Sequence, residues 1–441
     1  MSVLAEKIRE KAVRLNGASD VADEILALVG DARFVLIGEA SHGTHEFYRM
    51  RAAITKRLIA EKGFSAVAVE ADFPDAYRVN RFMRGLGNDK TANDALAAFT
   101  RFPLWMWRNT DVLEFVEWLK SHNENLEINE KIGFYGLDLY SLHSSMKSVL
   151  DYLEKVDPNA AEAARNRYSC FDHFGEDAQS YGYAASYDAH FSCEDEAVKQ
   201  LVELQKRAAE YASGDEFAAR DEYFFAEQNA RLVKNAEEYY RSMFRGRVSS
   251  WNLRDRHMAE TLDELAKHLE AENQPAKIVV WAHNSHLGDA RATEMGERGE
   301  WNVGQLARER YKNEACLIGF TTHAGTVAAA DNWDEPAQLK IVRPSDKDSY
   351  ERIFHETGLP EFFLNLRDAE TEKLLSRPQL ERAIGVIYRP QTERASHYFT
   401  AVLSEQFDGV IHFDKTRSVV PLDKSSSLTH EDAPQTFPEG V

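Results

Sequence analysis

Short apolar runs alternate with helix-like segments along most of this chain, and this alternation constrains the fold more than any other feature. The runs that we predict to be buried strands are 34–37, 66–69, 132–135, 278–281, 315–320, 384–388 and 409–413. The segments with helical spacing of apolar residues are 46–62, 112–123, 142–156, 305–310 and 398–407. Strands that alternate with helices favour an α/β fold with a mostly parallel central sheet flanked by helices.

One long section, 142–272, interrupts the alternation because no convincing strand lies within it. Two parts of this section, 222–244 and 252–269, have the apolar stripe of an amphipathic helix. We therefore expect a large helical insertion that forms one side of a deep active-site cleft. The chain of 441 residues then divides into a first part of the α/β core (1–141), the insertion (142–272) and a second part of the core (273–441).

Three further segments carry structural expectations. The polar and aromatic run 180–191 is predicted to be a loop, and the polar tail after Pro421 is predicted to be poorly ordered. Ser250 is expected to cap the start of a helix. Arg254 and Asp255, which follow on that helix, are interpreted as a structural ion pair.

Composition excludes several classes of protein. The net charge of −20 disfavours a nucleic-acid partner, because phosphate binding needs concentrated Lys and Arg. No apolar run approaches the roughly 20 residues that span a bilayer, and the N-terminus lacks an apolar signal core, so we expect neither a membrane partner nor secretion. Cys170, Cys193 and Cys316 lie far apart without CxxC spacing. Their spacing argues against a disulfide framework or a structural zinc site and favours a reducing cytoplasm.

Ionisable residues follow several of the predicted strands at the point where each strand ends. These residues are Glu39, His42, Glu70, Asp72, Asp138, His283, His286 and His323. In open α/β sheets, ligands bind outside the carboxyl ends of the strands. The residues come from distant parts of the sequence, and together they predict one composite site.

Three kinds of chemistry are compatible with such a site. A serine nucleophile needs a GxSxG turn, but Ser41 in GEASHG stands three residues after the glycine instead of two. A catalytic metal could be bound by His42, His45 and His283, although the HExxH pattern is absent and Arg49 stands four residues after His45. The remaining possibility is metal-free acid–base hydrolysis, which needs no cofactor.

Metal-free hydrolysis would use His42 as the base. Either Glu39 or Glu70 could orient its ring and hold its pKa near the working pH. Arg51 could anchor a carboxylate or stabilise the negative charge that develops during the reaction.

Later residues complete the expected site. His283 and His286 could act as proton donor and oxyanion partner. Trp105 belongs to the aromatic run FPLWMWRN, which could line an apolar pocket. The residues that we expect to bind substrate are His45, Asp72, Trp105, Asp138 and Arg389.

Several stretches of this sequence resemble the erythromycin esterase family. They are LIGEASHGTHEF, VEADFP, FYGLDLYSLHSSM, WNLRDRHMAETL, VVWAHNSHLGD and YRPQTERASHYFTAVLSEQFDGVIHFDKTR, in the same order as in the family. The resemblance spans nearly the whole chain, and the combination of GExxHG with WAHNxH is specific.

The resemblance implies metal-independent hydrolysis of the macrolactone ester in macrolide antibiotics, by an α/β core with a helical segment around a deep cleft. The family's general base falls on His42. Its other active-site positions fall on Glu39, Arg51, Glu70, His283 and His286. We therefore expect a cytoplasmic hydrolase with a small-molecule substrate, either a macrolide or another ester or lactone. The alternatives are a metal-dependent hydrolase, and a family member that acts on a different ester or in polysaccharide biosynthesis.

Overall fold

The computed structural model describes residues 2–175, 177–211, 217–270 and 275–423. In this part of the chain the strands of the main sheet are β1 (Val13–Arg14), β2 (Phe34–Ile37), β3 (Ala66–Asp72), β4 (Gly133–Asp138), β5 (Ile278–Trp281), β6 (Ala315–Ala329), β7 (Gln338–Val342), β8 (Glu361–Asn365) and β11 (Gly409–Thr416). A separate antiparallel pair consists of β9 (Gln379–Arg382) and β10 (Tyr398–Ala401).

The main sheet has the order β1-β8-β11-β6-β2-β5-β3-β4, and β7 pairs with β6 outside this path. The neighbours from β11 through β6, β2, β5 and β3 to β4 are all parallel. The strands β1, β7 and β8 pair in antiparallel fashion. The predicted α/β fold with a mostly parallel central sheet is therefore confirmed.

Helices flank the sheet. Those outside the section between β4 and β5 are α1 (Val3–Lys11), α2 (Asp23–Val29), α3 (His45–Lys62), α4 (Phe73–Arg84), α5 (Ala92–Leu96), α6 (Thr110–Asn123), α14 (Asn284–Leu287), α15 (Glu294–Glu297), α16 (Val303–Tyr311), α17 (Tyr350–His355), α18 (Ala369–Leu374), α19 (Glu393–Ser396) and α20 (Leu403–Gln406). Those within it are α7 (Leu142–Val156), α8 (Pro158–Tyr168), α9 (Ala178–Tyr187), α10 (Glu194–Lys206), α11 (Ala208–Tyr211), α12 (Phe217–Ser242) and α13 (Arg247–Leu269).

Alternate residues of the central strands enter two different hydrophobic cores. Phe34 and Leu36 of β2 belong to the core that includes residues of α7, α12 and α13, whereas Val35 and Ile37 belong to the core that includes residues of α3 and α6. All four side chains are fully buried. Burial on both faces explains why this strand is a continuous apolar run in the sequence.

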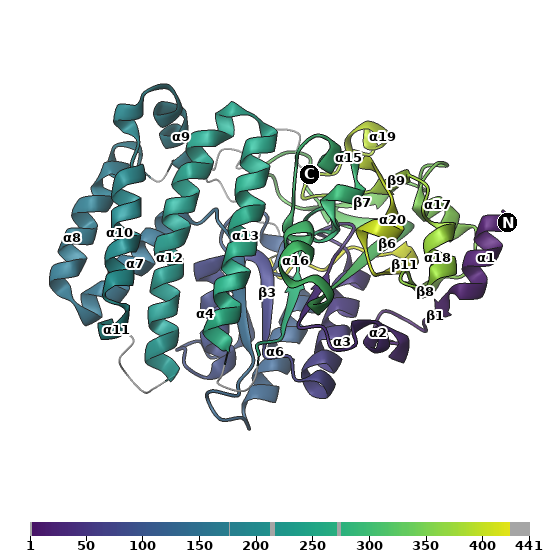
Figure 1. Cartoon of the computed structure of the whole chain (residues 1–441), viewed down its shortest axis with the longest axis horizontal. Coiled ribbons are helices and arrows are strands. Elements are labelled where there is room, and N and C mark those ends of the chain that lie inside the picture. The colour runs from purple at the N-terminus through teal and green to yellow at the C-terminus, as the bar shows by residue number, and fades with distance from the viewer. Residues whose placement is uncertain (1, 176, 212–216, 271–274, 424–441) are drawn as a thin grey trace.

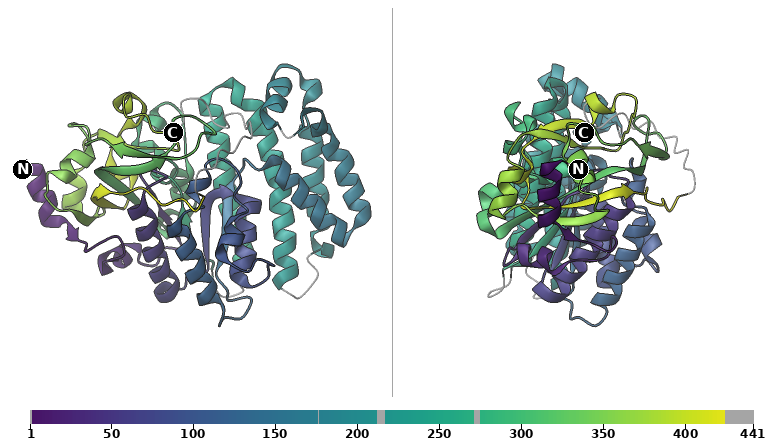
Figure 2. Two further views of the ribbon diagram at one scale, coloured as in Figure 1. Left: turned by 180° about the vertical axis from the view of Figure 1, so that it is seen from behind. Right: turned by 90° about the vertical axis from the view of Figure 1, so that its right-hand side faces the viewer.

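The described residues of 142–272 form helices and no strand, as the sequence predicts. Figure 1 shows α7, α8, α10 and α12 at one end of the molecule and α1 and α18 at the other, and the same arrangement is visible from behind in Figure 2. Helix α13 lies between this group and the strands, and it contacts both α12 and β4. The division of the chain into three parts remains a prediction.

Two expectations for the helical section are wrong. The run 180–191 is mostly helical, because α9 covers it as far as Tyr187 and buries Tyr181 and Ala185. Helix α13 begins before Ser250, whose hydroxyl donates to the carbonyl of Arg247 inside the helix and caps nothing.

Two predictions in the last third of the chain are also wrong. The run 384–388 forms only isolated bridges, and the neighbouring strand is β9. The predicted helix 398–407 is divided into strand β10 and the short helix α20. Residues of β10 alternate between half-buried and buried, and its aromatic and β-branched side chains suit such a strand.

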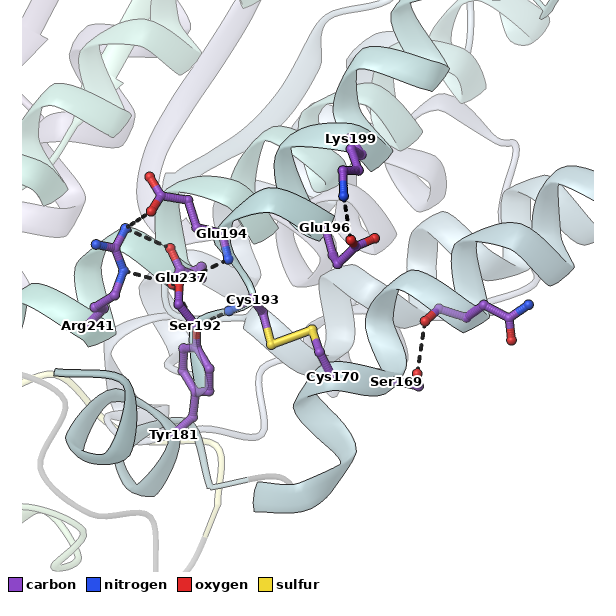
Figure 3. The surroundings of a disulfide bond; sticks show 11 residues. Ser169, Cys170, Tyr181, Ser192, Cys193, Glu194, Glu196, Lys199, Glu237 and Arg241 are labelled. Carbon is purple, nitrogen blue, oxygen red and sulfur yellow. Dashed lines mark hydrogen bonds and ion pairs between the residues drawn. A yellow bond between two sulfur atoms is a disulfide. The ribbon is translucent and has the colours of Figure 1, made fainter. Parts of the chain in front are cut away.

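Cys170 and Cys193 form a disulfide with their Cα atoms 5.9 Å apart, which corrects the expectation from cysteine spacing. Cys170 lies just after α8 and Cys193 just before α10, and the two sulfur atoms meet there (Figure 3). The hydroxyl of Tyr181 donates to Glu237 (2.6 Å) and accepts from the N–H of Cys193 (2.9 Å). Cys316 is a free, buried thiol. The cysteine argument for a reducing cytoplasm therefore no longer holds.

Two other sequence expectations concern the tail and membranes. The predicted disorder after Pro421 falls mainly on 424–441, which lies outside the described residues. Within the described ranges, no helix is both long and apolar enough to cross a membrane.

Asn284 connects three strands at the edge where the ionisable residues gather. Its backbone N–H donates to the carbonyl of Glu39 (2.8 Å), just after β2. Its side-chain amide donates to the carbonyl of Phe320 (2.8 Å) and accepts from the N–H of the same residue (3.3 Å) in β6. Gly38 permits this approach, because a Cβ at that position would lie 2.2 Å from Oδ1 of Asn284.

Gly38→Ala should therefore lower the free energy of unfolding by about 1–3 kcal/mol, since the added methyl group forces Asn284 out of place. Urea unfolding measures the change. Gly87→Ala is the control and should cost much less, because its Cβ would come no nearer than 3.3 Å to another atom. Equal stabilities of wild type and Gly38→Ala would contradict the proposed contact.

Candidate active site

The carboxyl ends of β2, β3, β4 and β5 surround one cavity of about 110 Å³. Its walls include His42, Glu70, Asp138, His283 and His286. The order β2-β5-β3-β4 makes these strands neighbours in the sheet, although they are distant in the sequence. The strand ends therefore bring these residues together, whereas His323, also expected here, pairs with Ser345 (2.6 Å) and does not line the cavity.

His42 lies in the loop after β2, and its Nδ1 is 2.9 Å from Oε1 of Glu39. The carboxylate can only accept, so Nδ1 carries the hydrogen and Nε2 keeps its lone pair in the neutral ring. Tyr48 fixes the backbone by donating to the carbonyl of His42 (2.8 Å). Nε2 is 4.0 Å from Oε1 of Glu70, across the cavity wall. This is the geometry of a histidine that can act as a general base.

Arg51 lies behind Glu39 and is absent from the cavity wall. It is 0% exposed, and one guanidinium nitrogen is 2.8 Å from Oε2 of Glu39. The guanidinium also packs over the rings of Tyr48 (4.4 Å) and Trp281 (5.1 Å). Of the two roles expected for Arg51, this position fits the anchoring of a carboxylate, that of Glu39. It does not fit direct contact with developing negative charge, because Glu39 stands between Arg51 and His42.

Glu70 joins several parts of the site. Its Oε1 accepts from the guanidinium of Arg254 (2.7 Å), and its Oε2 accepts from the backbone N–H of His283 (2.8 Å). The same guanidinium forms two hydrogen bonds to Asp138 at the end of β4 (3.0 and 2.7 Å). Arg254 therefore ties α13 to the ends of two strands.

Electrostatics keep Glu70 ionised. Burial opposes ionisation, but electrostatic interactions with His286, His42 and Arg254, together with the N–H of His283, outweigh it and hold the pKa of Glu70 well below its usual range. Glu70 is consequently a carboxylate at neutral pH.

His286 has a different environment. Its Nδ1 is 2.9 Å from Oδ1 of Asp255, and its ring stacks on Trp251 at 4.5 Å. Burial disfavours the charged ring, but Asp255 and Glu70 outweigh that effect and raise the pKa of His286 above its usual value. Its Nε2 lies 3.1 Å from a guanidinium nitrogen of Arg254, which can only donate, and 3.4 Å from Oε1 of Glu70.

His283 is a neutral donor. Its Nδ1 accepts from the N–H of Ser285 (3.3 Å), which places the ring hydrogen on Nε2. Burial and the neighbouring ring of His42 lower the pKa of His283 well below its usual value, against the opposing effects of Glu70 and the Ala40 backbone. Among the described residues, no partner binds Nε2, although the ring is 1% exposed. An unpaired N–H at the cavity can donate to an oxyanion.

Arg254 and Asp255 do not form the ion pair with each other that their sequence predicts. Arg254 binds Glu70, and Asp255 binds His286. Both lie on the buried side of α13. The sequence feature that could have indicated these contacts is the presence of two charged residues on the apolar face of a helix.

Three residues expected to bind substrate lie away from the cavity wall. His45 pairs with Asp111 (2.8 Å), Trp105 packs on Phe102 (ring centroids 5.2 Å apart), and Arg389 binds a backbone carbonyl elsewhere (3.2 Å). The side chains of His45, Trp105 and Arg389 therefore contact neighbouring residues and not the cavity. The expected residues that do line the cavity are Asp72 and Asp138.

The three-histidine metal site does not form. His42 and His283 are neighbours, with ring centroids 4.9 Å apart, but His45 points to Asp111 instead. Across the described ranges, no group of three or more His, Cys, Asp or Glu side chains is arranged to hold a metal ion.

A family model described as erythromycin esterase matches residues 59–416. The chain belongs to the erythromycin esterase family. This membership confirms the resemblance noted in the sequence and the predicted class of esterase hydrolase.

Relatives in this erythromycin esterase family are distant but span most of the chain. The putative hydrolase YbfO of Bacillus subtilis (strain 168) is 24% identical over 418 residues, covering 88% of this chain and 85% of that protein. Erythromycin esterase type II of Escherichia coli is 22% identical over 438 residues, covering 93% of this chain and 97% of that protein.

Solved structures share the fold. A succinoglycan biosynthesis protein has a TM-score of 0.77 at 22% identity, with 95% of this chain and 97% of that chain covered. A mutant of erythromycin esterase EreC in its open conformation has a TM-score of 0.66 at 18% identity, with 91% and 95% covered. At these identities the likeness supports the fold alone.

Arg254→Met should lower the free energy of unfolding by about 3–5 kcal/mol at pH 7, because Glu70 and Asp138 lose the cation that pairs with them in the interior. Urea unfolding measures the loss. The matched control is Arg256→Met on the same helix, whose ion pair with Glu238 is partly exposed. It should cost no more than about 1 kcal/mol.

The cost of Arg254→Met should also depend on pH. The folded pKa of Glu70 lies below its unfolded value of about 4.3, so its ionic stabilisation is complete above that pH and is lost as the pH falls through the folded pKa. The difference between wild type and variant should therefore be constant down to about pH 4.3 and shrink below it, which unfolding measured down to about pH 3.5 can follow. A difference independent of pH would contradict the pairing.

Proposed function

We propose that this member of the erythromycin esterase family cleaves the macrolactone ester of macrolide antibiotics with a water molecule activated by His42, without a metal ion. The observation that carries the proposal is the pairing of His42 and His283, whose rings lie 4.9 Å apart. One ring presents an acceptor nitrogen to the cavity and the other a donor. Ester hydrolysis needs a base for water and a donor for the oxyanion.

In the first step, one water lies between Nε2 of His42 and Oε1 of Glu70. These atoms are 4.0 Å apart, a separation that lets a single water hydrogen bond to both. His42 takes a proton from the water while the water oxygen bonds to the ester carbonyl carbon. Glu39 stabilises the resulting imidazolium, and Nε2–H of His283 donates to the oxyanion.

In the second step, the carbonyl re-forms and the bond from the carbonyl carbon to the ring oxygen breaks. The imidazolium of His42 returns its proton to the leaving alkoxide. The products are a carboxylic acid and a free hydroxyl on one opened chain, so the substrate gains one water. Glu70 and Arg254 keep the water position and the α13 side of the cavity in place.

The macrolide substrate is supported by the relatives. Two Escherichia coli proteins that are similar over most of this chain are named erythromycin esterase type I and type II. A macrolide would place its ester edge against His42 and His283 and the remainder of its ring along the half-buried aromatic residues of the wall, where the rings of Phe102 and Trp333 lie 5.3 Å apart.

A smaller ester is the second candidate, and cavity size favours it. The cavity of about 110 Å³ is smaller than the ~300–1,000 Å³ typical of sites for drug-sized ligands. A structural neighbour with the higher TM-score of 0.77 is described as a succinoglycan biosynthesis protein, which makes polysaccharide esters a reasonable class to test.

A panel of macrolides, with simple aliphatic esters and acylated sugars beside it, tests the proposal by mass spectrometry. Wild type should convert at least one macrolide to a product heavier by one water, and a chelator should leave the rate unchanged. His42→Ala should lower the rate by at least about 100-fold, because the general base is lost.

The matched control is His45→Ala, because His45 lies three residues further on and outside the cavity wall. Its rate should stay close to that of wild type. Full activity of His42→Ala would exclude the mechanism. Turnover of smaller esters without turnover of any macrolide would exclude the substrate and favour the second candidate.

A further inference from the structure

Two buried carboxyl groups lie next to the active site, and the ester chemistry uses neither of them. Glu381 belongs to β9 and Glu351 to α17, and both side chains are 0% exposed. The backbone N–H of Arg382, the residue after Glu381, donates to Oε1 of Glu351 (2.8 Å). The two acids are therefore neighbours in the interior of the protein.

No cation forms an ion pair with Glu351 or Glu381 in the part of the chain that the structure describes. The guanidinium of Arg382 is directed elsewhere, because it lies 3.3 Å from Glu393 and donates to the carbonyl of Arg343 (2.9 Å). The Oε2 atoms of both acids are buried, and no hydrogen-bond donor of the described residues reaches them. Two adjacent buried carboxylates without a cation are costly, and one bound proton relieves that cost.

Glu381 is the acid that holds this proton. Burial and the adjacent Glu351 raise the pKa of Glu381 to about 8, against the amides of Gln406 and Asn284. Burial raises the pKa of Glu351 as well, but the charge and the N–H of Arg382 oppose that rise. At neutral pH the pair thus consists of a neutral Glu381 and an ionised Glu351.

The other titratable group next to Glu381 is the phenol of Tyr350, also in α17. Burial raises the pKa of Tyr350, and Glu381 and Glu351 add to the rise. Its hydroxyl donates to the carbonyl of Arg377 (2.9 Å). Tyr350 therefore stays neutral over the range in which Glu381 loses its proton, and Glu351 is the charge that Glu381 then meets.

Glu381 reaches the active site through Asn284 of α14. Its Oε1 accepts from the side-chain amide of Asn284 (3.3 Å), which also donates to the carbonyl of Phe320 (2.8 Å). The backbone N–H of Asn284 holds the carbonyl of Glu39 (2.8 Å), and Asn284 directly follows His283. A side chain that supports Asn284 consequently supports both the residue that orients the base and the residue that donates to the oxyanion.

We propose that Glu381 is a positioning residue for the ester hydrolysis and works in its protonated form. The neutral carboxyl packs beside Glu351 and holds the amide of Asn284. When the proton passes to water, the two buried carboxylates repel one another, and Glu381 moves away from Asn284. The inference rests on the proposed ester hydrolysis and adds an alkaline limit to it, at a pH where His42 is available as a base.

The pH dependence of kcat is the first test, on 4-nitrophenyl butyrate and on each ester of the panel that wild type cleaves. Wild type should lose at least about 10-fold in kcat between about pH 7.5 and 9.5, because Glu381 loses its proton over that range. Glu381→Gln has an uncharged side chain of the same size, so its kcat should change by less than about 2-fold over the same range. A flat profile of wild type, or the same alkaline fall in Glu381→Gln, would overturn the proposal.

Glu237→Gln is the matched control. Glu237 is a buried glutamate (1% exposed) in α12, and its carboxylate lies 2.9 Å from a guanidinium nitrogen of Arg241. The alkaline fall in kcat of Glu237→Gln should match that of wild type. Loss of the fall in this control would show that it does not come from Glu381 and would overturn the assignment.

Urea unfolding tests the protonation of Glu381 without any substrate. Its folded pKa lies above the unfolded value of about 4.3, so the stability of the neutral form is complete below that pH and is lost as the pH rises through the folded pKa. Relative to wild type, the urea midpoint of Glu381→Gln should rise from about pH 5 to about pH 8 and then level off. A difference that is the same at every pH would overturn the protonated state.

Hydrogen exchange tests the connection to the active site, and it decides the role of Glu381 even if no ester is cleaved and the proposed hydrolysis fails. The segments to follow by mass spectrometry are 38–44 and 282–287. At pH 9 these segments should exchange at least about 3-fold faster in wild type than in Glu381→Gln, and at pH 6.5 the two proteins should match. Comparison at one pH removes the intrinsic pH dependence of exchange. Equal exchange of the two proteins at pH 9 would overturn the positioning role.

Discussion

The buried ion network around Arg254 holds together the two parts of the molecule that form the cavity. Arg254 belongs to α13, and it binds Glu70 and Asp138 at the ends of β3 and β4. Charges removed from water must stay paired, so α13 cannot leave this edge of the sheet without a large loss of stability. Glu70 then holds the backbone of His283 and faces His42.

The same network gives three histidines three different properties. His42 donates from Nδ1 to the carboxylate of Glu39, so its Nε2 is left as an acceptor. Arg51 pairs with the other oxygen of the same carboxylate. His283 contacts a backbone N–H and is kept neutral as a donor. His286 lies between Asp255 and Glu70, which favour its protonated form. One residue type thereby occupies three different electrostatic environments within one cavity.

Much of the sheet could be predicted because parallel strands buried on both faces are continuous apolar runs, such as FVLI and IVVW. The rule that ligands lie at carboxyl strand ends located Glu39, His42 and Glu70 without any contact information. Strand β9 was missed because two of its three buried residues, Glu381 and Arg382, are charged. Strand β10 was missed because its residues alternate between half-buried and buried, which gives a weaker pattern. The contacts of Arg254 could not be predicted for another reason. A helical pattern predicts which face of α13 is buried, but it does not predict which strand ends that face contacts.

The pairing of Cys170 and Cys193 could not be predicted for the same reason as the contacts of Arg254. Sequence spacing contains no information on how α8 and α10 pack, and that packing brings the two sulfurs together. Likewise, the motif at 38–51 contains more ionisable residues than the cavity uses. His45 and Arg51 belong to α3, whose direction turns one toward Asp111 and the other behind Glu39.

The most direct test of the account is the kcat of Glu39→Gln on any ester that wild type hydrolyses. Glutamine keeps the size of the side chain but removes the charge that orients and stabilises the ring of His42. We predict a fall in kcat of about 100- to 10,000-fold with KM little changed, in protein whose near-UV circular dichroism matches wild type. A kcat within about twofold of wild type would contradict a general base oriented by Glu39.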